Sequence, residues 1–69
     1  MELNKIISDN LRKLVVNTKF PNKTLAQLCD VNKATVSHWM DMDNPQRPSL
    51  ENLIKIADYY HVSVDDIVR

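Results

Sequence analysis

The sequence has 69 residues, 43% of them hydrophobic, and its nine basic side chains balance nine acidic ones. This length allows a single domain, residues 1–69, and the composition excludes a disordered chain. No apolar run approaches the roughly 20 residues of a membrane-spanning helix, so no membrane partner is expected, and the neutral balance at first argues against a nucleic-acid partner.

The first predicted element is an amphipathic helix over residues 3–17. Its charged side chains, Lys5, Asp9, Arg12 and Lys13, are expected to face mostly outward. Phe20 and Pro21 interrupt this helix, because proline cannot continue one. Glu2 stands where a signal peptide would carry positive charge, so we expect the cytoplasm. Apolar residues recur at steps of three and four at Leu3, Ile6, Ile7, Leu11, Leu14 and Val15.

The centre of the sequence holds two short helical patterns separated by a polar turn at residues 30–32. The first helix is predicted over about 23–29. It is capped either by Asn22 or by a capping box of Thr24 and Gln27.

The second helix is predicted over about 33–40, with Asn32 as its N-cap. Val36 and Trp39 or Met40 are expected to point inward. Two helices joined by three or four residues are how many proteins present a helix end to a DNA groove. The residues left facing outward are Lys33, Ala34, Ser37 and His38.

The last third of the sequence predicts a loop and two further helices. Residues 41–48 contain two prolines and no periodicity, so they form the loop. Ser49 is expected to cap a helix over about 50–60, and Ser63 a short helix that ends at Val68. The fold is therefore all-α, a compact five-helix bundle. The predicted buried stripe of the fourth helix is Leu50, Leu53, Ile54, Ile56, Ala57 and Tyr60.

Charge is segregated along the chain despite its zero sum. Residues 1–39 carry six basic and three acidic side chains, and residues 40–69 carry the reverse. The first half therefore offers a surface that phosphate groups favour.

Catalytic and metal-binding motifs are not expected. Cys29 is the single cysteine and is interpreted as a small buried hydrophobe. Asp41 and Asp43 suggest a calcium loop, but that motif needs glycine and glutamate where Gln46 and Asn52 stand. The chain has no glycine and thus no glycine-rich phosphate loop. We therefore expect no enzyme, cofactor, metal ion or small-molecule ligand.

A set of positions spread over nearly the whole chain carries a family resemblance: 11–14, Phe20, 25–26, Val31, 36–37, Trp39, 48–57 and 62–67. At these positions the sequence resembles the Cro and phage-repressor type of helix-turn-helix, also called XRE-like. The resemblance implies a lambda-repressor-like DNA-binding domain from a phage or bacterium, with the helix over about 33–40 as its recognition helix.

The same resemblance implies two sets of contacts with double-stranded DNA. Residues expected to reach base edges are Asn32, Lys33, Ala34, Thr35, Ser37 and His38. Residues expected to contact phosphates are Asn22, Lys23, Thr24, Gln46 and Arg47.

The sequence departs from the family at two pairs of positions. Asp30 and His61 stand where the family has glycine, so both are expected in left-handed backbone geometry. Val15 and Met40 replace a basic and an acidic partner of the family's ion pair. Because both partners became apolar together, their side chains are predicted to touch.

By resemblance, the function is that of a small transcriptional regulator, most simply a Cro-like repressor on a pseudo-palindromic operator. It is expected to act as a homodimer, which could form only on DNA. The zero net charge keeps an alternative open, a protein-interaction module such as an anti-repressor or antitoxin. Candidate dimer-interface residues are Val62, Val64, Ile67 and Val68.

Overall fold

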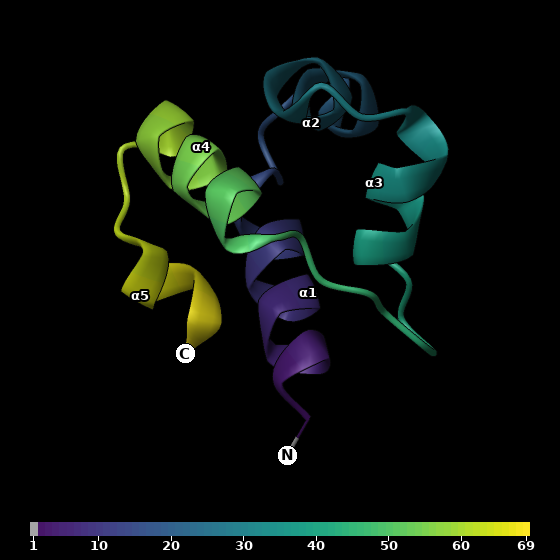
Figure 1. Ribbon diagram of the computed structural model, residues 1–69, viewed down its shortest axis with the longest axis vertical. Helices are drawn as coiled ribbons and strands as arrows, with labels where there is room; N and C mark the ends of the chain where they lie inside the picture. Colours follow the sequence, from purple (N-terminus) through teal and green to yellow (C-terminus); the bar gives the residue numbers. More distant parts are fainter. Residues whose placement is uncertain (1) are drawn as a thin grey trace.

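The computed structural model describes residues 2–69, and helices are the only regular elements in them (Figure 1). The predicted all-α fold with five helices is confirmed. None of the helices in this range is long and apolar enough to cross a membrane. The elements are α1 (Leu3–Leu14), α2 (Pro21–Cys29), α3 (Lys33–Trp39), α4 (Leu50–Tyr60) and α5 (Val64–Val68).

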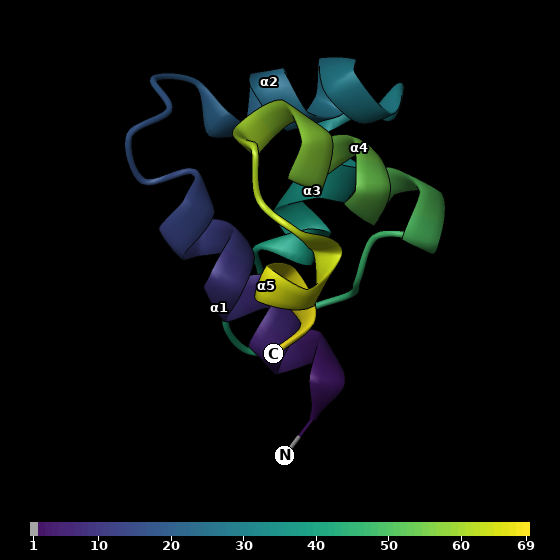
Figure 2. The same ribbon diagram turned by 90° about the vertical axis from the view of Figure 1, so that its left-hand side faces the viewer.

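The helices enclose one hydrophobic core. α1 packs against α5, α2 packs against α3 and α4, and α4 also packs against α5. Figure 2 shows the connection from α1 to α2 swinging out to one side before α2 returns over the other helices. Every helix contributes to the core, which consists of Ile7, Leu11, Val15, Leu25, Ala26, Cys29, Val36, Trp39, Leu53, Ile56, Ala57 and Ile67.

α1 ends at Leu14, three residues before the predicted end at residue 17. Val15 already leaves helical geometry, with φ −93° and ψ 8°. The sequence that follows, Val-Val-Asn-Thr, consists of poor helix formers, which explains the early end. Val15 still buries its side chain in the core.

α2 begins at Pro21, two residues before the predicted start. Proline suits the first helical position, where its missing N–H would have no intrahelical partner. The N-cap is Phe20, and no side chain caps the helix. The predicted caps, Asn22 or the Thr24 and Gln27 pair, are therefore wrong.

The other predicted caps are confirmed. Asn32, Ser49 and Ser63 each accept a hydrogen bond from the backbone N–H three residues further on. Asp30 and His61 adopt left-handed geometry, with φ of 56° and 58°. α3 ends one residue earlier than predicted, at Trp39.

The predicted buried stripe of α4 is wrong at two positions. The side chains of Leu50 and Ile54 are 66% and 46% exposed. They lie at one edge of the helical stripe, whereas α2 and α5 cover the face that carries Leu53, Ile56 and Ala57. α4 therefore presents an apolar edge that no other element covers.

Candidate nucleic-acid interface

α2 and α3 form a helix-turn-helix whose underside is buried. Ala26 is 7% exposed, and Val36 and Trp39 are 0% and 3% exposed, as the sequence predicted. Small and apolar side chains thus let α3 pack on α2 and the core. Thr35 is half-buried, and the side chains that remain exposed on this helix and its N-cap are Asn32, Lys33, Ala34, Ser37 and His38.

The N-terminal end of α3 is fixed by Asn32. Its Oδ1 atom accepts the backbone N–H of Thr35 at 2.8 Å and the hydroxyl of the same residue at 2.9 Å. Both bonds use the side-chain oxygen, so the amide N–H₂ of Asn32 keeps its donors for another partner. The first turn of α3 therefore combines a rigid backbone with an exposed donor.

A side-chain hydrogen bond joins the first turn of α2 to the middle of α3. The Nδ2 atom of Asn22 donates to the Oγ atom of Ser37 at 3.1 Å. The structure thus brings together one residue predicted for phosphate contact and one predicted for base contact. Since Ser37 accepts in this bond, its own hydroxyl hydrogen remains available to donate.

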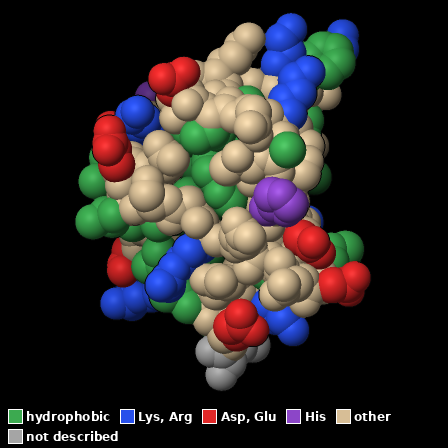
Figure 3. All heavy atoms as spheres, turned by 45° about the vertical axis from the view of Figure 1, so that its right-hand side comes forward, with side chains coloured by type: hydrophobic (Ala, Val, Ile, Leu, Met, Phe, Trp, Pro, Cys, Tyr) green, Lys and Arg blue, Asp and Glu red, His purple; other side chains and the backbone are tan. Residues whose placement is uncertain are grey.

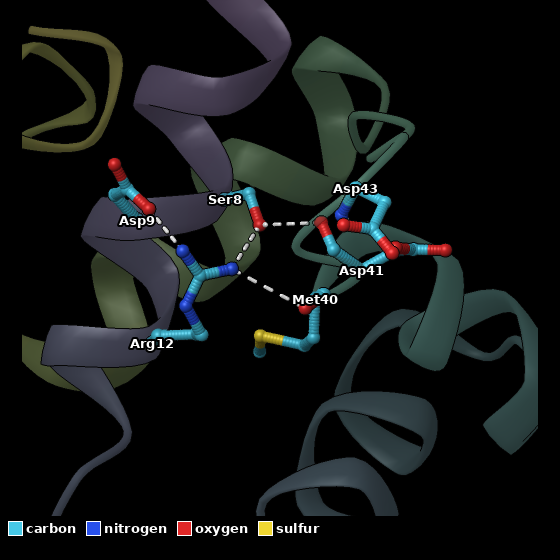
Figure 4. Close-up of polar contacts among 6 residues, drawn as sticks. All are labelled: Ser8, Asp9, Arg12, Met40, Asp41 and Asp43. Atoms are coloured by element: carbon cyan, nitrogen blue, oxygen red, sulfur yellow. Dashed lines mark hydrogen bonds and ion pairs between the residues drawn. The ribbon is translucent and has the colours of Figure 1, made fainter.

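Arg12 holds the C-terminal end of α3, although the sequence predicted it to face outward. Its Nη1 atom donates to the carbonyl oxygen of Met40 at 3.2 Å and to the Oγ atom of Ser8 at 2.6 Å (Figure 4). Its Nη2 atom pairs with Asp9. The last carbonyls of a helix lack intrahelical donors and carry partial negative charge, so a cation there is favourable. The Arg12 side chain therefore stays partly exposed, but its guanidinium is turned toward the end of α3 instead of facing solvent alone.

The loop after α3 is also held against α1. Asn4 donates from Nδ2 to the carbonyl of Pro45 at 3.1 Å, and the hydroxyl of Ser8 donates to the carbonyl of Asp41 at 3.5 Å. With Arg12, these residues recur every four positions and form a polar stripe on one face of α1. This stripe fixes residues 40–45 and, through them, the end of α3.

The Asp41 carboxylate is directed at its own loop. It accepts the backbone N–H groups of Asp43 at 2.8 Å and Asn44 at 3.3 Å. These two hydrogen bonds lower the pKa of Asp41, and the nearby His38 acts in the same direction. The carboxylate thus stabilises a turn.

The second group of predicted phosphate contacts lies just beyond α3. The backbone N–H of Gln46 donates to the carbonyl of His38 at 2.9 Å, and the side chains of Gln46 and Arg47 are exposed. The structure therefore places these two residues beside the end of α3, while Asn22, Lys23 and Thr24 lie in α2.

Two hollows border the helix-turn-helix. One is lined by Lys23, Ala26, Gln27, Asp30, Val31, Asn32 and Lys33. The other is lined by Lys19, Phe20, Pro21, Asn22, Lys23 and Lys33. Lys23 and Lys33 border both, so they lie near each other although they come from different helices. Lys19 and Phe20 line the second hollow, although no functional role was predicted for them from the sequence. A lysine and an aromatic side chain directly before the proline that starts a helix are the signal that could have found them.

Basic side chains cluster at one place on this side of the molecule. Figure 3 shows basic side chains gathered around a hydrophobic one at its upper right, while acidic and other basic side chains are spread over the rest of the same face.

Val15 and Met40 both border a further surface hollow and both pack against the core. They therefore lie on the same side of the core, and contact between their side chains stays a prediction. Cys29 is 4% exposed, and burial raises the pKa of its thiol. This agrees with its interpretation as a small buried hydrophobe.

The four candidate dimer residues differ in exposure. Val62, Val64 and Val68 are partly buried against the core. Ile67 is 2% exposed and belongs to the core itself. It therefore has almost no surface to offer a second copy, and its assignment to an interface is corrected.

A family model described as helix-turn-helix matches residues 11–67. The chain belongs to this family. The match begins within α1, ends within α5 and includes both central helices. The helix-turn-helix proteins of this XRE-like, Cro/C1 type are DNA-binding transcription regulators, and double-stranded DNA is therefore the partner of this chain. No curated protein and no solved structure matches the chain.

Proposed function

We propose that this helix-turn-helix protein is a Cro-like repressor that inserts α3 into the major groove of a pseudo-palindromic operator. The observation that carries the proposal is the polar outer face of α3 on a fully buried underside. Both ends of that helix are held by hydrogen bonds, so its side chains are presented by a rigid element. Rigid presentation is what discrimination between base pairs needs.

Base reading is assigned to the residues predicted from the sequence. Lys33 donates to guanine O6 and N7, and Ala34 or the methyl group of Thr35 contacts a thymine methyl. Asn32, Ser37 and His38 supply further hydrogen bonds to base edges. Their exposure, or half-burial in the case of Thr35, supports this assignment.

Phosphate binding is assigned to both flanks of α3. Asn22, Lys23 and Thr24 act from the first turns of α2, and Gln46 and Arg47 act from the loop after α3. Such contacts set the register of a protein on the duplex. The bond from Asn22 to Ser37 supports a coupling in this chain, because a shift of Asn22 on the backbone displaces a base-reading side chain.

A homodimer is proposed because a single domain of this size buries little DNA surface. Two copies on a two-fold axis would place their recognition helices about 34 Å apart. Val62, Val64 and Val68 remain the proposed interface, without Ile67. The proposal covers a dimer that forms in solution and one that forms only on DNA. The cytoplasmic location stays a prediction.

The test is a titration of fluorescent duplex with the unaltered chain at about 50 and 200 mM salt. The probes are a duplex selected by the chain from a random library and a scrambled control. Repressor function predicts tight binding to the selected duplex and a steep loss of affinity with salt. Absence of binding at the lower salt would instead favour the protein-interaction module.

Two lysine variants then test the assignment of contacts. Lys33→Ala should change the order of preferred sequences, and Lys23→Ala should weaken all sequences alike. Both remove one charge from the same neighbourhood, so each is the control for the other. Identical effects of the two substitutions would show that the assignment is wrong.

A further inference from the structure

We propose that the hollow at the start of α2 binds one sugar-phosphate unit of the DNA backbone, with Lys19 on the phosphate and Phe20 against the deoxyribose. This inference rests on the proposed function, because its ligand belongs to the duplex that α3 reads. It adds two residues to the interface that neither the motif nor the sequence had assigned.

The hollow has the size and position for such a unit. Its volume is about 590 Å³, and it lies between the connection from α1 to α2 and the first turn of α3. Sites that hold small molecules occupy roughly 300–1,000 Å³, so a sugar with its phosphate fits.

The charge of the hollow selects an anion. Three of its six lining residues are lysines, Lys19, Lys23 and Lys33, and the set includes no carboxylate. The ion pairs of residues 2–69 lie elsewhere, between Arg12 and Asp9, Lys55 and Glu51, and Arg69 and Asp65. Three cationic side chains bordering one hollow, with no carboxylate among its lining residues, favour an anion there.

Phe20 gives the hollow an apolar wall. The side chain of this residue is 61% exposed, so it contributes little to the core. Its backbone is fixed, because its carbonyl accepts the N–H of Thr24 at 2.9 Å and Pro21 follows it. The Nζ atom of Lys19 lies 5.6 Å from the centre of the ring. A phosphate on that ammonium would therefore bring its own sugar to the ring.

The hollow is continuous with the proposed interface. Asn22 and Lys23, proposed phosphate contacts, line it from α2, and Lys33, a proposed base contact, lines it from α3. An occupant of this hollow is thus a neighbour of groups already on the duplex. This continuity favours the backbone of the bound operator over a free nucleotide.

The experiment compares Lys19→Ala and Phe20→Ala with the unaltered chain on the selected duplex at about 50 and 200 mM salt. Lys5→Ala is the matched control, because it removes the same charge from an exposed position in the first turn of α1. The fluorescence of the buried Trp39 during urea unfolding shows whether each variant folds as the unaltered chain does. A second set of duplexes carries one neutral methylphosphonate, moved through the backbone step by step.

Lys19→Ala should weaken binding several-fold and reduce the salt slope by about 0.9, the value for one phosphate contact. The factor by which Lys19→Ala binds more weakly than the unaltered chain should therefore shrink about three- to fourfold from the lower to the higher salt concentration. Phe20→Ala removes no charge, so it should weaken binding by the same factor at both salt concentrations. One methylphosphonate position should weaken the unaltered chain but leave Lys19→Ala unaffected.

Binding of both variants with the affinity and salt slope of Lys5→Ala would overturn this inference and leave the proposed function intact. Failure of the unaltered chain to bind any duplex would overturn both. Competition by free nucleotide at the same hollow, without a sensitive methylphosphonate position, would assign the site to a different ligand.

Discussion

The guanidinium of Arg12 reaches from the last turn of α1 to the carbonyl oxygen of Met40, the C-cap of α3, over 3.2 Å. The contact joins two residues that lie 28 positions apart in the sequence. It places a cation at the negative end of the proposed recognition helix and satisfies a carbonyl that the helix leaves open. The orientation of α3 therefore depends on a side chain outside the helix-turn-helix itself.

Arg12→Ala should lower the free energy of unfolding by about 1–3 kcal/mol, because it removes charge-assisted hydrogen bonds from a partly buried site. It should also weaken DNA binding, since the end of α3 loses its support. Urea unfolding followed by the fluorescence of Trp39 measures the first effect, and duplex titration measures the second.

Lys13→Ala is the matched control, because Lys13 is an exposed basic neighbour in the same turn. Its effect on stability should stay within about 0.5 kcal/mol. Equal losses of stability in Arg12→Ala and Lys13→Ala would show that the hydrogen bonds of Arg12 contribute nothing specific.

Asp41→Ala tests the turn after α3. The pKa of Asp41 is lowered by the backbone N–H groups of Asp43 and Asn44, so the ionised carboxylate stabilises the folded chain. This contribution should be complete above the ordinary pKa of 3.8 and should disappear as the pH falls through the lowered value. The stability difference between Asp41→Ala and the unaltered chain should therefore vanish in acid.

Asp43→Ala removes an exposed carboxylate from the same loop but keeps the backbone N–H that Asp41 uses. We expect it to unfold like the unaltered chain near neutral pH. If Asp41→Ala stayed less stable than the unaltered chain by the same amount far below pH 3.8, the role of the carboxylate would be contradicted.

Local sequence patterns predicted much of this fold because each depends on neighbouring residues. The side-chain caps at Asn32, Ser49 and Ser63 need only the N–H groups three residues away. The left-handed geometry of Asp30 and His61 was instead implied by the family resemblance, because the family has glycine at both positions. Local chemistry and tertiary packing agree at these positions.

Contacts between distant segments were not predictable in the same way. The partners of Asn4, Ser8 and Arg12 lie 28 to 41 residues away, so nothing near them in the sequence indicates that they bind a loop. Helical periodicity placed Leu50 and Ile54 on the buried stripe, but the width of that stripe depends on which helices cover it. The hollow beside Phe20 likewise exists only because α2 and α3 cross.

Substitution of His61 by glycine should stabilise the chain. A residue with a Cβ atom in left-handed geometry costs roughly 1–2 kcal/mol, and glycine avoids most of this at an entropic cost of about 0.5–1 kcal/mol. The net gain should be up to about 1 kcal/mol, or roughly 4–8 °C in Tm for a domain of this size. Thermal unfolding by circular dichroism measures it.

Asp30→Gly should gain less than His61→Gly, because aspartate tolerates left-handed geometry better than histidine does. His61→Val is the opposite control, since a β-branched side chain is poorly accepted there. An increase in Tm for the valine variant would show that the backbone at residue 61 is not strained.

Val15→Arg and Met40→Glu together should rebuild the ion pair of the family. Val15 is 6% exposed, so Val15→Arg alone buries an unpaired charge, which typically costs about 3–5 kcal/mol and approaches the whole stability of a small domain. Met40→Glu alone should be milder, because Arg12 lies beside Met40 and can pair with the new carboxylate. The double variant should recover about 0.5–3 kcal/mol relative to the sum of the single effects, measured as a double-mutant cycle in urea. Additive effects would show that the two side chains do not touch, and that the apolar pair stabilises the chain through separate parts of the core.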